Sequence, residues 1–222
     1  SRERRRKLLI NQVPVKTGAE LSRVYNTVFF CPEDLLLIRE GAAARRRFLD
    51  VTLSQLRPRY AEALAQYHRT YEHKTRIPDL LDTLPEFNER LVRYGAVLIH
   101  YRHQFSLRLR EYAALNHREC SGEREELEIQ YATVSTVTDP GADLSVLMNQ
   151  LRTHMESHRE AERASRLCLS GPHKDDLLVT IDGRDAKQYA SQGQTRTAAL
   201  SMKLAEREIY KNVVGEYPVL LL

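Results

Sequence analysis

The pattern of hydrophobic and polar positions divides the chain into three parts. In the middle part, apolar side chains recur at every third or fourth position, which is typical of amphipathic helices, whereas both ends carry short apolar runs. The middle part predicts helices at residues 42–57, 60–76, 87–118 and 144–168. The ends predict a hairpin and short strands, at residues 4–16, 27–30, 177–189 and 219–222.

Local signals refine the helical predictions. Pro58 interrupts the first helical run, and Pro78 and Pro85 are expected to bracket a turn before the longest helix. A short helix is also predicted at 19–25, and the last long helix is expected to be polar on most faces around residues 154–159. The buried side of the longest helix is predicted from its spaced apolar residues, Leu91, Leu98, Phe105 and Leu109.

Three segments carry strand signals of different kinds. Alternation over residues 127–133 predicts a half-exposed strand. The dipeptide Asp182-Gly183 favours a hairpin in which 177–181 pairs with 186–189. Residues 219–222 are apolar throughout, which predicts a buried parallel strand.

Composition restricts the class of protein. The 34 basic and 30 acidic residues give a net charge of +4, which permits nucleic-acid contact without proving it. Cys31, Cys120 and Cys168 are far apart and lack metal-ligand spacing, so reduced thiols and no metal site are expected. No apolar run approaches membrane-spanning length and no signal peptide is present in the sequence, so we expect no membrane partner and a cytoplasmic location.

The most informative motif lies at residues 189–197. Ser191 and Gln194 have the spacing of a capping box, which predicts the start of a helix that continues over 198–209. Gly193 leaves the backbone bare, and a helix N-terminus carries free N–H donors that suit a phosphate. Taken alone, the motif is consistent both with an ordinary capped helix and with a phosphate contact.

Three segments in this order resemble the RecF family of SMC-like, ABC-type ATPases. They are Asn-Thr-Val-Phe-Phe-Cys-Pro-Glu-Asp-Leu at 26–35 with Arg-Arg-Arg-Phe-Leu-Asp at 45–50, Leu-Ser-Gly-Pro-His-Lys-Asp-Asp-Leu at 169–177, and the motif at 189–197. The resemblance covers essentially the whole chain. It implies an α/β fold that is part of an ABC-type ATPase head, with sheet fragments at both ends and a helical insertion that forms a short arm.

The same resemblance divides the chain into three regions. Residues 1–41 would be the tail of the N-terminal part of the head, 42–167 the mostly helical insertion, and 168–222 the C-terminal part with the signature motif and the start of the Walker B strand. No Gly-x-x-x-x-Gly-Lys-Ser/Thr motif occurs in the sequence, and the Walker B acidic residues are expected just after Leu222. We therefore expect a fragment that neither binds nor hydrolyses ATP alone, whereas the intact family member uses ATP and Mg²⁺ as a weak DNA-dependent ATPase.

The resemblance also implies how the signature motif acts. In ABC-type ATPases the signature of one head contacts the γ-phosphate that the other head holds. By that resemblance Ser191 and Gly193 would donate to the γ-phosphate in trans, while Gln192 and Gln194 shape the turn, which makes the homodimer ATP-dependent. The family usually has a second Gln where this chain has Thr195, so no role is assigned to that side chain.

Two more segments are candidates by the same resemblance. Cys31 and Glu33 occupy the place of the Q-loop, although a rigid proline turn that caps the next helical segment explains them equally well. His173, Lys174 and Asp175 could contact nucleotide, DNA or the dimer partner, and the alternative is a solvated turn before the strand.

Arginines near the start of the insertion are candidate DNA contacts. The set is Arg45, Arg46, Arg47, Arg57 and Arg59. In the competing interpretation, Arg47 pairs internally with Asp50 or Glu40 and the cluster anchors the arm to the head. Both interpretations stay open from the sequence.

At the level of function, the resemblance implies an ATP-dependent DNA clamp of recombinational repair and replication, with a place in the SOS response. Its partners would be duplex or gapped DNA with single/double-strand junctions, and RecO and RecR, with which it would help load RecA. The alternatives are another SMC-like or ABC-type ATPase head and, for this chain in isolation, a non-enzymatic interaction module.

Overall fold

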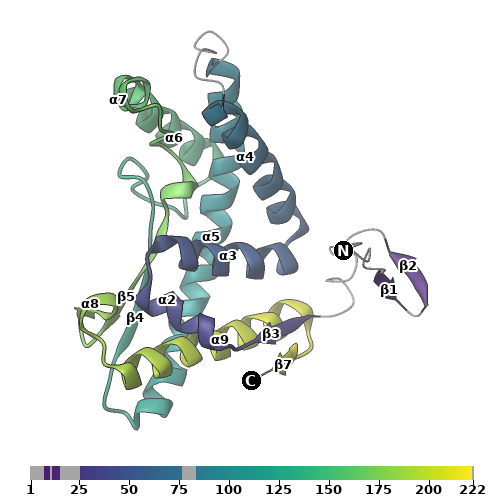
Figure 1. Ribbon diagram of the computed structural model, residues 1–222, viewed down its shortest axis with the longest axis vertical. Helices are drawn as coiled ribbons and strands as arrows, with labels where there is room; N and C mark the ends of the chain where they lie inside the picture. Colours follow the sequence, from purple (N-terminus) through teal and green to yellow (C-terminus); the bar gives the residue numbers. More distant parts are fainter. Residues whose placement is uncertain (1–7, 11, 16–25, 77–83, 222) are drawn as a thin grey trace, which may run out of the picture.

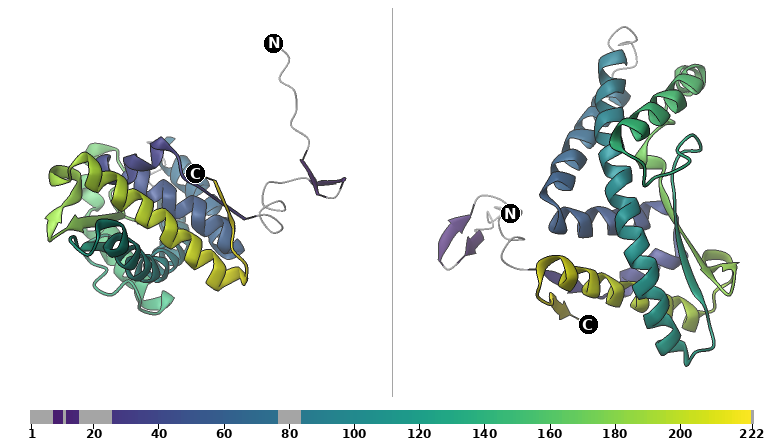
Figure 2. Two further views of the ribbon diagram at one scale, coloured as in Figure 1. Left: turned by 90° about the horizontal axis from the view of Figure 1, so that it is seen from below. Right: turned by 180° about the vertical axis from the view of Figure 1, so that it is seen from behind.

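A single long helix organises the fold. The computed structural model describes residues 8–10, 12–15, 26–76 and 84–221, in which α5 (Leu84–Ser121) has 38 residues and runs along most of the long axis (Figures 1 and 2). It packs against α4 (Pro58–Arg76), α6 (Leu144–Ser157), α9 (Gln192–Val214) and the strand β4 (Leu127–Ala132). The four residues predicted for its apolar side, Leu91, Leu98, Phe105 and Leu109, are all buried, which confirms that prediction.

Prolines set the helix boundaries, though not all as expected. The helix α3 (Ala42–Leu56) ends before Pro58, with which α4 begins, so the predicted interruption is confirmed. Pro85 lies in the first turn of α5 rather than in a turn before it, because a proline at that position loses no helical hydrogen bond. Pro78 and the helix predicted at 19–25 lie outside the described residues.

The last helix of the insertion differs from the expectation. Instead of one helix over 144–168, the chain forms α6 and α7 (Arg159–Ser165), separated at His158. The expected polar character is also wrong at His154 and Met155, which are buried against the core. The segment ends at Arg166, whose φ of 56° leaves the helical region.

A three-stranded antiparallel sheet crosses between the insertion and the C-terminal region. β4 pairs with β5 (Asp176–Ile181), which pairs with β6 (Arg184–Asp185). Asp182 and Gly183 have φ of 50° and 72°, which confirms the predicted turn. The predicted strand at 186–189 is wrong, because the Asp185 carboxylate accepts a hydrogen bond from the Lys187 N–H and starts the short helix α8 (Ala186–Tyr189).

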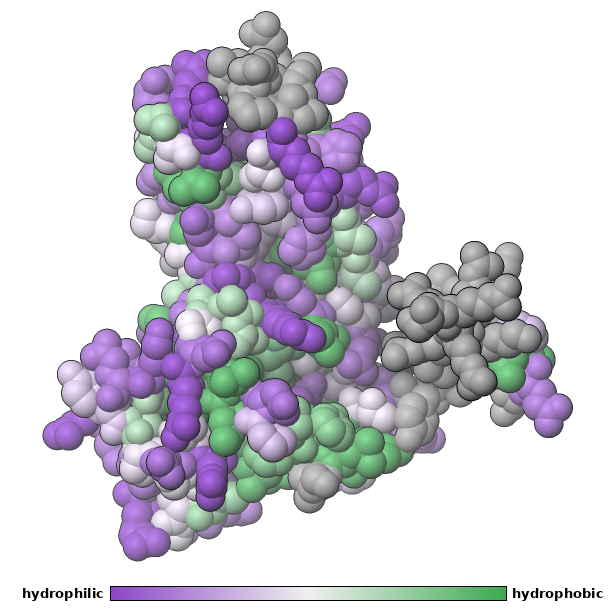
Figure 3. All heavy atoms as spheres, viewed as in Figure 1, coloured by the Kyte–Doolittle hydropathy of each residue, from purple (hydrophilic) through white to green (hydrophobic). Residues whose placement is uncertain are grey.

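A parallel strand pair lies beside α9. β3 (Thr27–Phe29) pairs with β7 (Val219–Leu221) in parallel, between residues 192 positions apart, so the predicted parallel character of the last strand is confirmed. The expected burial of this strand is wrong for residues 219–221, because Val219 and Leu221 are exposed and only Val28 of the facing strand is buried, whereas Leu222 lies outside the described residues. Figure 3 shows apolar side chains gathered over this edge of the molecule.

The remaining elements are short. β1 (Leu8–Ile10) and β2 (Val13–Val15) form the predicted antiparallel hairpin. The 3₁₀ helix η1 (Pro32–Leu35) leads into α2 (Leu36–Arg39), and η2 (Pro172–Lys174) precedes β5. Within the described ranges, no helix is long and apolar enough to cross a bilayer, and no group of three or more His, Cys, Asp or Glu side chains could hold a metal ion.

Candidate nucleotide and DNA sites

The signature motif forms the exposed N-terminal turn of α9. The Ser191 Oγ accepts a hydrogen bond from the Gln194 N–H at 3.2 Å, and the Gln194 Oε1 accepts one from the Ser191 N–H at 2.9 Å. This is the capping box that the spacing predicts. Ser191, Gln192 and Gly193 are all exposed, so the N-terminus of a 23-residue helix faces solvent.

Contacts beneath this turn hold it in place. Thr195 is buried, and its hydroxyl donates to the Ser191 carbonyl at 2.8 Å. The Gln194 Nε2 donates to Glu125 Oε1 at 3.1 Å. A Cβ added at Gly193 would meet only the Ser191 Oγ, at 3.9 Å, and the backbone there is helical. The fold itself therefore does not require glycine at this position, whereas the close approach of a ligand would.

The Q-loop-like segment forms a capped turn. Cys31 is the N-cap of η1, and its backbone N–H donates to Asp34 Oδ2 at 2.8 Å. Partial burial and the neighbouring carboxylates raise the pKa of the Cys31 thiol, which disfavours the reactive thiolate. Glu33 is exposed, so the geometry contains both the turn and a solvent-accessible carboxylate.

The His173 side chain closes the turn before β5. Its Nε2 lies 2.8 Å from the Cys168 carbonyl and its Nδ1 lies 2.7 Å from the Tyr67 hydroxyl on α4. A carbonyl can only accept, so these partners assign the neutral tautomer with its proton on Nε2. Burial lowers the pKa of His173 to about 4, which keeps the ring neutral near pH 7. Lys174, the next residue, is exposed.

Asp175 lies at the centre of a buried network. Its carboxylate accepts from Arg102 Nη1 at 2.8 Å and from the Tyr131 hydroxyl. Arg102 is also buried, and donates to Asp50 Oδ1 at 2.7 Å and to the Pro172 carbonyl at 2.6 Å. No ligand can reach Asp175 in this arrangement, because it is fully buried. This corrects the expectation that Asp175 contacts nucleotide, DNA or the dimer partner directly. Of His173, Lys174 and Asp175, only Lys174 is exposed.

Sequence reasoning missed Arg102, although a signal was present. It follows Leu98 by four positions and precedes Phe105 by three, so an arginine lies within the apolar stripe of α5. Charged side chains are almost never fully buried unless they are paired. A cation in such a stripe therefore indicates buried acidic partners elsewhere in the chain.

Two arginines of the cluster, Arg45 and Arg46, bind other parts of the fold. Arg45 is buried and binds Asp176 with two nitrogens, Nε at 2.7 Å and Nη2 at 2.8 Å, while its Nη1 donates to the Glu40 carbonyl. Arg46 donates to the Asp175 carbonyl at 2.7 Å. The anchoring function considered for Arg47 thus belongs to Arg45, which corrects its assignment as a DNA contact.

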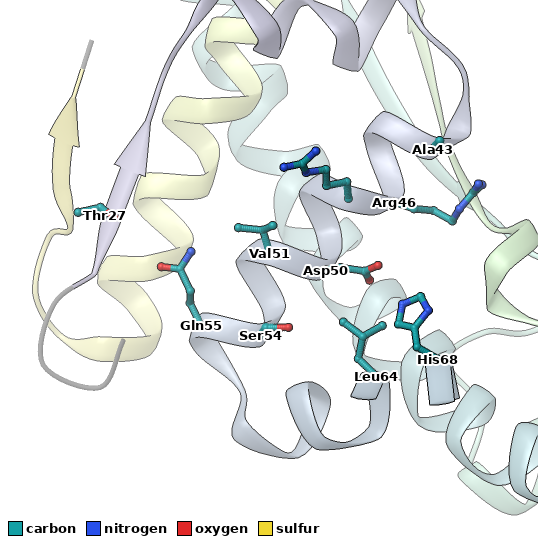
Figure 4. A pocket seen from close by; sticks show the side chains of 10 residues that line it. Thr27, Ala43, Arg46, Asp50, Val51, Ser54, Gln55, Leu64 and His68 are labelled. Carbon is teal, nitrogen blue, oxygen red and sulfur yellow. The ribbon is translucent and has the colours of Figure 1, made fainter. Parts of the chain in front are cut away.

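The other arginines remain available to a ligand. Arg47 is exposed and makes no ion pair with any described residue. With Arg46 and His68 it lines a groove of about 740 Å³ between α3, α4 and β3 (Figure 4). Arg57 and Arg59, at the junction of α3 and α4, are exposed but do not line this groove. The full lining is Thr27, Ala43, Arg46, Arg47, Asp50, Val51, Ser54, Gln55, Leu64 and His68.

The architecture, sheet fragments joined by a helical insertion, is that of an α/β ATPase-head fragment. The structure of the recombination mediator protein RecF-ATPrS in the RecFOR pathway matches it with a TM-score of 0.87 at 31% identity, covering 95% of this chain and 58% of that one. The RecF-ATP structure from the same pathway matches with a TM-score of 0.85 at 32% identity, with the same coverage.

Sequence relatives agree with this likeness. The DNA replication and repair protein RecF of Alkaliphilus oremlandii is 37% identical over 225 residues, which cover 99% of this chain and 61% of the relative. The protein of that name from Bacillus subtilis is 36% identical over 221 residues, covering 96% of this chain and 60% of the relative. No family model matches the chain. The chain belongs to the RecF family and spans about three fifths of the length of these relatives.

Proposed function

We propose that this chain is the signature-bearing part of an ATP-dependent DNA clamp that acts in recombinational repair and replication. Two heads would close on ATP and Mg²⁺ around duplex or gapped DNA and help load RecA together with RecO and RecR. Relatives named as DNA replication and repair proteins, and solved neighbours named as a recombination mediator in the RecFOR pathway, support this proposal. A cytoplasmic location and a place in the SOS response belong to the same proposal.

The proposal divides the chain as the resemblance implies. Residues 1–41 and 168–222 belong to the head, and 42–167 form the arm. The pairing of β4 with β5 links the arm and the head through one sheet. If DNA displaces the arm, β4 would therefore move β5, the strand that precedes the signature turn.

The observation that carries the proposal is the turn at Ser191–Gly193. The Ser191 oxygen accepts from the Gln194 N–H, so the hydroxyl proton is free to donate to a phosphate oxygen. The Gly193 N–H belongs to the first turn of α9, where the helix leaves N–H groups without helical acceptors. These donors would sense the γ-phosphate that a second copy presents, with Gln192 and Gln194 shaping the turn. Cys31 and Glu33 would lie near the magnesium and the attacking water.

DNA contact is assigned to the exposed cations of the arm. Arg47 lines the groove, and Arg57 and Arg59 are exposed at the junction of α3 and α4. Arg46 also lines the groove, but it is half-buried and one of its nitrogens donates to the Asp175 carbonyl. Contacts from exposed guanidinium groups bind phosphates and carry no base information, so they suit a protein that recognises the shape of a DNA junction. Lys174 is a further exposed cation on η2.

Two substitutions at Ser191, made in the intact reading frame, test the nucleotide-sensing role. Ser191→Arg places a bulky cation at the cap and should abolish ATP-dependent dimers. Ser191→Asp keeps a good N-cap but sets a negative charge against the γ-phosphate, so it should fold normally and also fail to dimerise. Light scattering with a slowly hydrolysed ATP analogue measures the dimer, and thermal melts measure the fold.

The opposite outcome is equally clear. If Ser191→Asp melts and dimerises as the unsubstituted protein does, Ser191 is only a helix cap. Ser191→Ala then should cost about 1 kcal/mol of stability, which is typical for the loss of such a cap, and nothing else.

A further inference from the structure

Tyr189 is an ordered aromatic side chain that points into solvent. It is 67% exposed, more than any other large apolar side chain in the described residues. The short helix that ends with it is held firmly, because Ala186 is buried and accepts from the Ala190 N–H at 3.1 Å. Tyr189 lies two residues before Ser191, so the two Cα atoms are at most about 7 Å apart.

A polar pocket lies between this side chain and the signature turn. It has a volume of about 310 Å³, and Arg184, Tyr189 and Gln194 contribute to its lining. Asp182 also lines it, and one oxygen of its carboxylate accepts from the Glu126 N–H at 2.8 Å. Arg184 is exposed and forms no ion pair with any described residue, so its guanidinium is free to bind a ligand.

These three groups together match the parts of a nucleotide. A capped helix N-terminus suits a terminal phosphate, an uncommitted guanidinium suits further phosphate oxygens, and a flat aromatic ring suits a base. The residues around Tyr189, namely Arg184, Asp185, Lys187 and Gln188, are exposed and polar. A lone aromatic among charges fits the stacking of a base better than an apolar protein interface, which needs a wider apolar patch.

We infer that Tyr189 and Arg184 complete the nucleotide site in trans: Tyr189 packs against the base, and Arg184 binds phosphate oxygens, of the ATP that a second copy presents to Ser191. This inference rests on the proposed function. It assigns recognition of the nucleoside to the signature-bearing copy, so that closure depends on the base as well as on the γ-phosphate.

The inference is tested by measuring dimerisation of the full-length protein as a function of ATP concentration. Tyr189→Ala should raise the ATP concentration for half-maximal dimerisation by roughly tenfold, in line with the loss of one base–aromatic stack. Tyr189→Phe should retain the unsubstituted value, and Arg184→Ala should show a smaller increase that high salt removes. Lys187→Ala is the matched control, because Lys187 is an exposed residue of the same short helix that does not line the pocket, and it should have no effect.

Photo-cross-linking identifies the ligand directly. ATP that carries an azide on the adenine should label the peptide that contains Tyr189 in the dimer, and the label should disappear in Ser191→Asp. If the dimer forms without label on this peptide, or if Tyr189→Ala matches Lys187→Ala, the inference is overturned. If either result is found but Ser191→Asp fails to dimerise, only the inference fails and the proposed function stands. If Ser191→Asp dimerises normally, the proposed function itself is contradicted.

Discussion

Arg102 and Asp175 form a buried ion pair that joins the longest helix to the turn before β5. Arg102 Nη1 lies 2.8 Å from Asp175 Oδ2, and the two residues are 2% and 0% exposed. The same guanidinium reaches Asp50 on α3 at 2.7 Å. One side chain therefore links α5, α3 and the segment after η2, and it fixes the base of the arm against the C-terminal strands.

Removal of the Arg102 charge should destabilise the chain strongly. Arg102→Met keeps an unbranched side chain of similar length but leaves the buried Asp175 without its cation, which should lower the free energy of unfolding by about 3–5 kcal/mol. Arg152→Met is the control, because Arg152 pairs with Glu89 at the surface and should cost about 1 kcal/mol or less. Urea unfolding measures both, and equal effects would contradict the structural importance of the buried pair.

The neutral His173 ring should make stability fall in mild acid. Its pKa of about 4 in the folded chain lies below the ordinary value near 6.5, so only the unfolded chain takes up a proton between those values. This contribution to the free energy of unfolding is present above pH 6.5 and is lost as the pH falls toward 4. The loss amounts to about 2 kcal/mol at pH 5.

His173→Gln removes the titrating group and provides the comparison. The difference in unfolding free energy between pH 7 and pH 5 should be smaller by about 2 kcal/mol in this variant than in the unsubstituted chain. Other histidines contribute equally to both proteins and cancel in the comparison. Parallel pH profiles would show that His173 is accessible to protons in the folded chain.

Gly171 should not tolerate a side chain. Its φ of 130° lies in a region that only glycine adopts readily, and a Cβ there would overlap the Tyr67 hydroxyl. Gly171→Ala should therefore cost about 3 kcal/mol or more. Gly183 is the control, because its φ is also positive but a Cβ there would meet open space. Gly183→Ala should therefore lower the free energy of unfolding by only about 1 kcal/mol.

A double-mutant cycle between Gly171 and Tyr67 tests why Gly171→Ala destabilises the chain. If the overlap with the hydroxyl contributes, Gly171→Ala should cost less when it is introduced into Tyr67→Phe than into the unsubstituted chain. Additive effects of the two substitutions would assign the whole cost to backbone strain.

The arginine cluster should separate DNA binding from stability. Arg47→Ala should weaken duplex binding and reduce the slope of log affinity against log salt by about 0.9, because one phosphate contact is lost, while the melting temperature stays unchanged. Arg45→Ala should instead lower the melting temperature, because it leaves Asp176 without its partner. An unchanged salt slope in Arg47→Ala would exclude the groove as a DNA contact.

Much of the architecture was predictable from local patterns. Apolar spacing over three and four positions located α5 and its buried residues, since a helix that packs on a core must present one apolar side. Proline and Asp-Gly placed the break before Pro58 and the turn after β5. The capping box at Ser191 was predictable for the same reason, because all of its hydrogen bonds lie within four residues.

Two other elements were predicted wrongly, one for a local cause and one for a cause distant in the chain. β6 is cut to two residues by an aspartate cap that favours α8 over a longer strand. His154 is buried because its Nδ1 lies 2.8 Å from the Ser170 hydroxyl, a partner sixteen residues away. Local polarity misled the prediction there, since a buried polar group needs only one well-placed partner.

By itself, the sequence determined most of the long helices, the turn after β5, the family and the capping box at Ser191, because the signals for each lie in residues close together in the chain. Only the tertiary structure decided which charged residues serve the fold and which remain free. Arg45 and Arg47 are two positions apart and chemically identical, yet Asp176, 131 residues later, engages only the first. Burial together with a specific partner makes that difference, and both arise only when α3 packs against β5.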